Sequence, residues 1–102
     1  MVSALEFSIR HWREIHDCGG NIGSDHCALC RACQGDGCDR CPLYVLKMGC
    51  DETYRSPWRR VRRLVGGKDV PAPSLRKRGA DDAIVVMLLC LMLAREEFVS
   101  GR

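Results

Sequence analysis

The chain has 102 residues and a net charge of +3, so it is long enough for one domain and too short for two ordinary ones. Aromatic residues make up only 6% of the sequence, and chains of this size often depend on metals, disulfides or oligomerisation for stability. The amino terminus lacks a basic stretch followed by an apolar one, which argues against a secretory signal. We therefore expect a cytoplasmic protein with reduced cysteines.

A first helix is predicted from residues 9 to 16, because apolar side chains recur there at helical spacing. Ser8 precedes this helix as an N-cap, and the pair Gly19-Gly20 ends it. A second, short helix is expected from Ser24-Asp25 to Cys33. A third follows Cys41-Pro42 and ends at Gly49.

The next helix is predicted to begin at Ser56-Pro57 and to end at Gly66-Gly67. Trp58, Val61 and Leu64 recur along it at helical spacing and form its apolar face. Arginines fill the positions between them: Arg59, Arg60, Arg62 and Arg63.

The carboxyl-terminal part divides into a linker and a strong helix. Residues 66–79 contain three glycines, two prolines and a basic triplet, which are typical of a linker. Asp81-Asp82 then opens a helix that is apolar nearly all round, and its apolar run from Ala83 to Ala94 is too short for a membrane span of about 20 residues. We expect no membrane association and no strand.

A helix that is apolar on all sides is normally buried inside something. Here it is expected to pack on its own domain, on a second copy of the chain in a dimer, or on a larger protein. The candidate partner-binding residues are Leu88, Leu91, Met92 and Trp58. The predicted organisation is a cysteine-rich metal-binding domain at 1–65, a basic Gly/Pro linker at 66–79 and an apolar helix at 80–98.

The dense run of cysteines is the strongest chemical signal. The CxxC pairs Cys27/Cys30 and Cys38/Cys41 are only seven residues apart, and two such pairs complete a closed tetrahedral site for one structural zinc ion. The expected ligands are four of the five residues Cys27, Cys30, Cys38, Cys41 and Cys50. The candidate residues for a second site are Cys18, Cys33, His16 and His26. Cys90, inside the apolar helix, is expected to be a small buried hydrophobe.

An iron–sulfur cluster is the main alternative to zinc. The bacterial ferredoxin pattern for [4Fe–4S] is C-x₂-C-x₂-C-x₃-C-P, whereas this chain has C-x₂-C-x₂-C-x₄-C-x₂-C-P from Cys27 to Pro42. Disulfides are the third reading, since eight cysteines would pair evenly, but they require export. The sequence has no phosphate-binding glycine loop, no GxSxG and no zinc-deaminase pattern, so we expect no enzyme.

Charge is distributed unevenly along the chain. The segment from Arg55 to Arg78 carries a net charge of +8, and the remainder carries −5. Nucleic-acid binding is therefore an alternative function, with phosphates bound by Arg59, Arg60, Arg62, Arg63, Arg76, Lys77 and Arg78 and bases stacked on Trp58 and Tyr54. The competing interpretation is that these arginines are simply the solvated face of an amphipathic helix.

Several motifs together resemble a known group of proteins. His11-Trp12, the CALC run at 27–30, the CxxCP run at 38–42, Gly49-Cys50 and Ser56-Pro57-Trp58 are similar to short cysteine-rich proteins of bacteriophages and bacterial mobile elements. The resemblance covers about residues 8 to 60. It implies a small zinc-dependent fold acting in the cytoplasm of a bacterial host, and it carries no activity with it. By position, the shared cysteines are Cys27, Cys30, Cys41 and Cys50, followed by Cys38, whereas Cys18 and Cys33 are additional in this chain.

Taken together, these patterns predict a small, mainly α-helical, metal-stabilised domain of the zinc-knuckle type with an apolar carboxyl-terminal helix. The leading hypothesis for its function is a non-enzymatic adaptor or inhibitor that docks on a larger bacterial protein, for example in host takeover or anti-defence. Nucleic-acid binding and an Fe–S role are the alternatives.

Overall fold

The computed structural model describes residues 2–23, 28–32, 43 and 56–100, and within these it is small and mainly helical, as predicted. The helices are α1 (Val2–Cys18), α2 (Ala28–Ala32), α4 (Pro57–Val65) and α5 (Arg78–Val99). The two-residue strands β1 (Gly20–Asn21) and β2 (Asp69–Val70) and the 3₁₀ turn η3 (Pro73–Leu75) join them.

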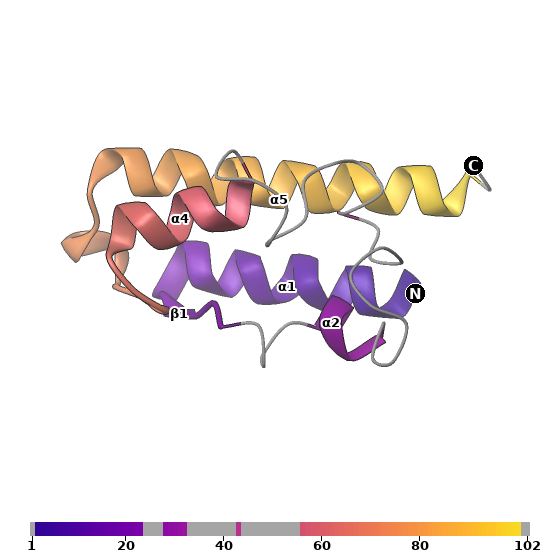
Figure 1. The fold of residues 1–102 in the computed structure, drawn as a ribbon, viewed down its shortest axis with the longest axis horizontal. Coiled ribbons are helices and arrows are strands. Elements are labelled where there is room, and N and C mark those ends of the chain that lie inside the picture. Colours follow the sequence, from indigo (N-terminus) through magenta and orange to yellow (C-terminus); the bar gives the residue numbers. More distant parts are fainter. Residues whose placement is uncertain (1, 24–27, 33–42, 44–55, 101–102) are drawn as a thin grey trace.

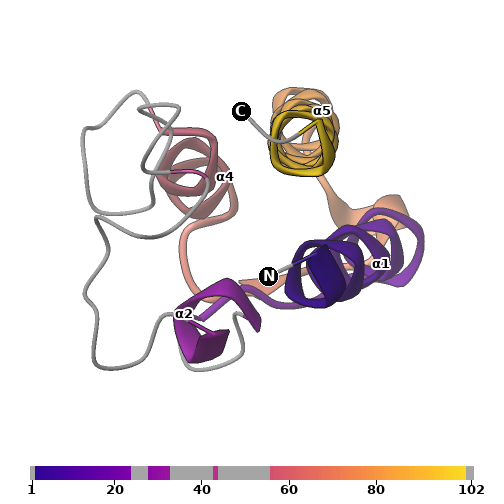
Figure 2. The ribbon, with the colours of Figure 1, turned by 90° about the vertical axis from the view of Figure 1, so that its right-hand side faces the viewer.

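The long helices α1 and α5 lie side by side and run in opposite directions, and α4 packs against the first half of α5 (Figure 1). Seen end-on, α1, α4 and α5 occupy three corners around a shared interior, and α2 lies beside α1 (Figure 2). The carboxyl-terminal helix therefore packs on its own chain, which the sequence had left open.

The interior of the molecule is lined by one cluster of buried apolar side chains. Every helix contributes at least one residue that is at most 1% exposed: Leu5 and Ile15 from α1, Leu29 from α2, Val61 from α4, and Ile84 and Leu91 from α5. Leu43 is also buried in this cluster. Burial of such side chains is the main stabilising contribution to a fold of this size.

Helix α1 begins at Val2, so the prediction that Ser8 caps its start is wrong. Ser8 is a buried residue inside the helix. The extra amino-terminal turns place Leu5, which is 0% exposed, in the core, and this burial outweighs the preference of serine for an N-cap position.

The predicted stop of α1 at Gly19-Gly20 is confirmed. Gly19 has a φ of +83°, and a Cβ atom there would lie 2.5 Å from the carbonyl oxygen of Val70. Only glycine fits this close approach, which brings β1 against β2 in an antiparallel pair, Gly20 opposite Val70 and Asn21 opposite Asp69. The segment 66–79, expected to be a linker, thus contains a paired strand with a buried Val70 and packs with the rest of the fold.

The predicted limits of α4 are also confirmed. Ser56 is the N-cap, and its Oγ accepts a hydrogen bond from the backbone N–H of Arg59 at 3.2 Å, with Pro57 in the first turn. Gly66 ends the helix in the left-handed conformation at φ +80°, and its N–H donates to the carbonyl of Arg62.

Helix α5 begins slightly earlier than predicted, at Arg78, with Lys77 as its N-cap and Asp81 in its first turn. The buried Ala80 explains the extension, because it packs in the interior from the added turn. In the part of the chain that the structure describes, no helix meets the length and apolarity needed to cross a membrane.

Candidate functional site

The most unusual surface lies on the side of α5 that faces away from α1 and α4. Val85, Val86, Leu89 and Leu93 are 41%, 41%, 57% and 49% exposed, and their spacing places them on one side of the helix. The opposite side is buried: Ala80, Ala83, Ile84, Met87, Leu91 and Ala94. We call the four exposed residues the apolar outer face of α5.

The residues predicted from the sequence to bind a partner lie elsewhere. Leu91 is 0% exposed and belongs to the core, so its prediction as a partner-binding residue is corrected. Leu88, Met92 and Trp58 are half-buried and pack against the same core. A helix with apolar residues on all sides carries no periodicity that marks which stripe faces inward, and this explains why Leu91 was assigned to the outer side.

Helix α4 presents a contrasting outer surface. Arg59, Arg60, Arg62 and Arg63 are all exposed, whereas Val61 is fully buried. We call these four residues the arginine face of α4. The Arg62 guanidinium lies 5.3 Å from the centre of the Trp58 ring, a cation–π distance. Trp58 itself is held from its other end, because its Nε1–H donates to the carbonyl of Ile22 at 2.7 Å.

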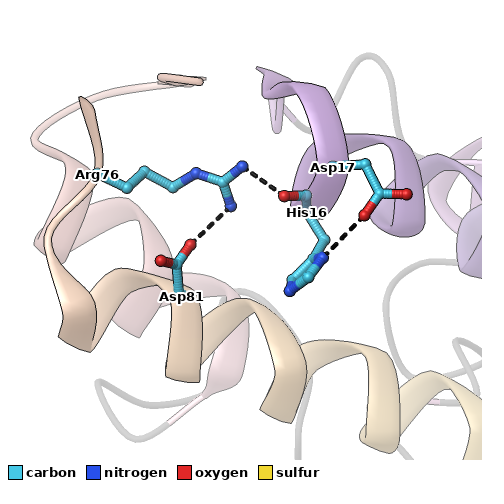
Figure 3. Close-up of polar contacts among 4 residues, drawn as sticks. All are labelled: His16, Asp17, Arg76 and Asp81. Carbon is cyan, nitrogen blue, oxygen red and sulfur yellow. Dashed lines mark hydrogen bonds and ion pairs between the residues drawn. The ribbon is translucent and has the colours of Figure 1, made fainter. Parts of the chain in front are cut away.

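Arg76 departs from its predicted role as a phosphate ligand. Its side chain is 0% exposed and is aimed between α1 and α5 (Figure 3). One terminal nitrogen donates to the carbonyl of His16 in the last turn of α1. Nη1 lies 3.0 Å from Oδ1 of Asp81, an ion pair without hydrogen-bond geometry. Arg76 thus ties the end of α1 to the start of α5, while Lys77 and Arg78 are exposed.

Most of the predicted metal ligands lie outside the described residues. These are Cys27, Cys33, Cys38, Cys41, Cys50 and His26, and only the backbone of Cys30 is described, in α2. Of the remaining candidates, Cys18 is an exposed free thiol, and Nδ1 of His16 lies 3.0 Å from Oδ1 of Asp17. Among the residues that the structure describes, no three His, Cys, Asp or Glu side chains gather around a common point.

Two buried leucines accompany the cysteine pattern. Leu43 was expected on the apolar face of a helix after Cys41-Pro42, whereas the burial of Leu29 was not predicted. Leu29 lies between Cys27 and Cys30 in the sequence, and Leu43 lies two residues after Cys41. Both side chains are buried in the core, at 1% and 4% exposure. The chain is thus fixed to the helices at one point in each half of the predicted metal-binding segment. The sequence feature that could have indicated the burial of Leu29 is its apolar side chain between the two cysteines of a CxxC pair.

Two other predicted residues behave as ordinary parts of the fold. Cys90 is a partly buried free thiol beside the core, and burial raises the pKa of this thiol. His11 donates from Nε2 to the carbonyl of Asn21 at 3.0 Å and so links α1 to β1.

Comparisons with family models, curated proteins and solved structures find no match to this chain.

Proposed function

We propose that the chain is a small, non-enzymatic protein-binding module that docks on a larger bacterial protein through the apolar outer face of α5. The observation that carries the proposal is the exposure of Val85, Val86, Leu89 and Leu93 on a helix whose other side already fills the core. Contiguous exposed apolar side chains on a soluble protein are characteristic of interaction surfaces.

The geometry of this face suits insertion into an apolar groove. A protein with such a groove binds apolar side chains at positions i, i+3, i+4 and i+7 of one helix. Val85, Leu89 and Leu93 follow each other at four-residue intervals and match this spacing. Exposed acids, Asp82 and Glu96, stand at the two ends of the row and provide a polar rim. The helix is anchored by its buried side, so little ordering is needed on binding.

We also propose that a structural zinc ion, held by four of Cys27, Cys30, Cys38, Cys41 and Cys50, stabilises the segment between α1 and α4. The ligand spacing supports it, and so does the fixing of Leu29 and Leu43 in the core. Native mass spectrometry before and after a strong chelator tests it. One zinc per chain is expected. Iron with inorganic sulfide, and a brown colour, would establish the [4Fe–4S] alternative. A chain mass lower by two hydrogen atoms for each bond would establish disulfides.

Site-specific crosslinking tests the docking surface. A benzophenone-bearing amino acid replaces Leu89, or replaces Arg13 on the exposed side of α1 as a matched control, in bacterial cells under ultraviolet light. We expect one heterologous adduct from position 89 and none from position 13. The crosslinked protein is then purified, and Leu89→Asp should weaken its binding by at least about tenfold.

Two outcomes contradict the proposal. An adduct with a second copy of the chain would show that the face is a dimer interface. Equal crosslinking from positions 89 and 13 would show that the face has no selective partner.

A further inference from the structure

The arginine face of α4 is a second surface, on a different helix from the proposed docking face. Arg59, Arg60, Arg62 and Arg63 lie within about one turn of a nine-residue helix, at about 1.5 Å rise per residue. All four are arginine, whose planar guanidinium forms paired hydrogen bonds with phosphate oxygens. The arginine face therefore carries four positive charges, each on a planar guanidinium group.

Neighbouring acids leave most of this charge uncompensated. Within the described part of the chain, Arg60, Arg62 and Arg63 take part in no ion pair with a carboxylate; the ion pairs found there involve His16, Arg76 and Arg95. The acid that follows α4, Asp69, instead accepts a hydrogen bond from the side chain of Asn21. Arg60, Arg62 and Arg63 therefore remain available to an external polyanion.

The helix holds these side chains in a fixed pattern. Val61, fully buried, anchors α4 in the core, while the Ser56 cap and the left-handed Gly66 fix its two ends. The carboxyl-terminal end of α4 also lies at the same end of the molecule as the start of α5, where Lys77 and Arg78 are exposed (Figure 1). A preorganised array of this kind binds an extended anion with little loss of conformational entropy.

The aromatic residue beside the array is not available to bases. Trp58 is half-buried, its Nε1–H is used by the Ile22 carbonyl, and Arg62 stands over its ring. Base stacking on Trp58, which the sequence suggested, is therefore blocked on this side. Contacts to phosphates fix position and carry no direct sequence information, so this surface has the chemistry for backbone binding alone.

We propose that the arginine face of α4 binds the phosphate backbone of nucleic acid without reading its sequence. Each phosphate neutralised releases condensed counterions, so the affinity falls steeply with salt. For the three contacts that Arg60, Arg62 and Arg63 can make to duplex DNA, the dissociation constant should rise about 40-fold between 50 and 200 mM KCl.

Fluorescence anisotropy with a labelled 20-base-pair DNA duplex tests the proposal, with an RNA duplex of the same sequence in a parallel arm. The test variant is R60Q/R63Q, and the matched control is R10Q/R13Q, which removes two exposed arginines from α1 and changes the net charge equally. Circular dichroism confirms that both variants fold. We expect R60Q/R63Q to weaken binding at least about tenfold and to reduce the salt slope by about two, with R10Q/R13Q within about threefold of the parent.

Several results would overturn the proposal. Equal losses in the two variants would mean that only net charge matters. Equal competition by poly-L-glutamate would assign the face to acidic protein surfaces. A difference above tenfold between A·T-rich and G·C-rich duplexes would show base readout. Absence of binding to both DNA and RNA at 50 mM KCl would show that the arginine face does not bind a phosphate backbone.

Discussion

Helices α4 and α5 pack against each other and share one core, yet they present opposite chemistry to solvent. The outer surface of α4 is made of arginines, and that of α5 is made of valines and leucines. Their inner sides are alike, because each buries aliphatic side chains such as Val61 and Leu91. The difference shows that the inner stripes of both helices carry the apolar packing of the fold, while their outer stripes take no part in the core.

The largest expected effect separates the two sides of α5. Leu91→Ala should lower the free energy of unfolding by about 3 kcal/mol, because it opens a cavity in the core. Leu89→Ala, two residues away on the outer face, should change it by less than about 0.5 kcal/mol. Urea unfolding followed by circular dichroism measures both. Equal decreases in the free energy of unfolding would mean that the apolar outer face of α5 is covered in solution. The two helices would then not differ in what they expose.

The second effect separates two arginines of the basic segment. Arg76→Ala should lower the free energy of unfolding by about 2 kcal/mol, since it removes the donor to the His16 carbonyl and the partner of Asp81. Arg60→Ala, on the arginine face, should stay within about 0.5 kcal/mol. Thermal unfolding at matched salt is the measurement. Arg76→Met serves as a control that keeps the buried stem; full recovery of stability by Met would show that packing, not hydrogen bonding, is the cause.

The third effect concerns how the two helices begin. Ser56 caps α4 with its side chain, whereas Lys77 provides no side-chain cap for α5. Ser56→Ala should therefore destabilise by about 1 kcal/mol, and Lys77→Ser should stabilise by about 0.5 kcal/mol. Chemical denaturation of each single variant measures whether the free energy of unfolding falls for Ser56→Ala and rises for Lys77→Ser. Destabilisation by Lys77→Ser would show that the backbone N–H groups at the start of α5 already have hydrogen-bond partners.

The smallest effect is chemical and leaves stability unchanged. Burial raises the pKa of Cys90 on α5, so a smaller fraction of its thiol is ionised at a given pH than for an unshifted thiol. Because Cys18 is exposed and Cys90 is partly buried, Cys18 should react faster with iodoacetamide, and the labelling rate of Cys90 should rise between pH 7.5 and 9.5 as its thiol ionises. Peptide mass spectrometry at pH 7.5 and 9.5 measures the two rates. Faster labelling of Cys90 would indicate that α5 opens away from the core.

The sequence predicted the features that depend on local chemistry. Ser56-Pro57 and Gly66 act on neighbouring backbone groups, so both limits of α4 were found, and Gly19 was found in the same way. Features set by packing were missed. The start of α1 depends on the burial of Leu5, and the burial of Arg76 depends on a carbonyl 60 residues away. The choice between Leu89 and Leu91 depends on where α1 and α4 lie.

The hydrogen bond from Trp58 to Ile22 has a consequence for how such chains can diverge. It joins two residues that lie 36 positions apart in the sequence, on either side of the segment at 24–55. The entropy of closing a loop grows only with the logarithm of its length, about 0.6 kcal/mol for each doubling. Insertions and deletions between these points are therefore inexpensive as long as Leu29 and Leu43 keep their places in the core. Length variation in the segment at 24–55 is therefore compatible with an unchanged packing of α1, α4 and α5.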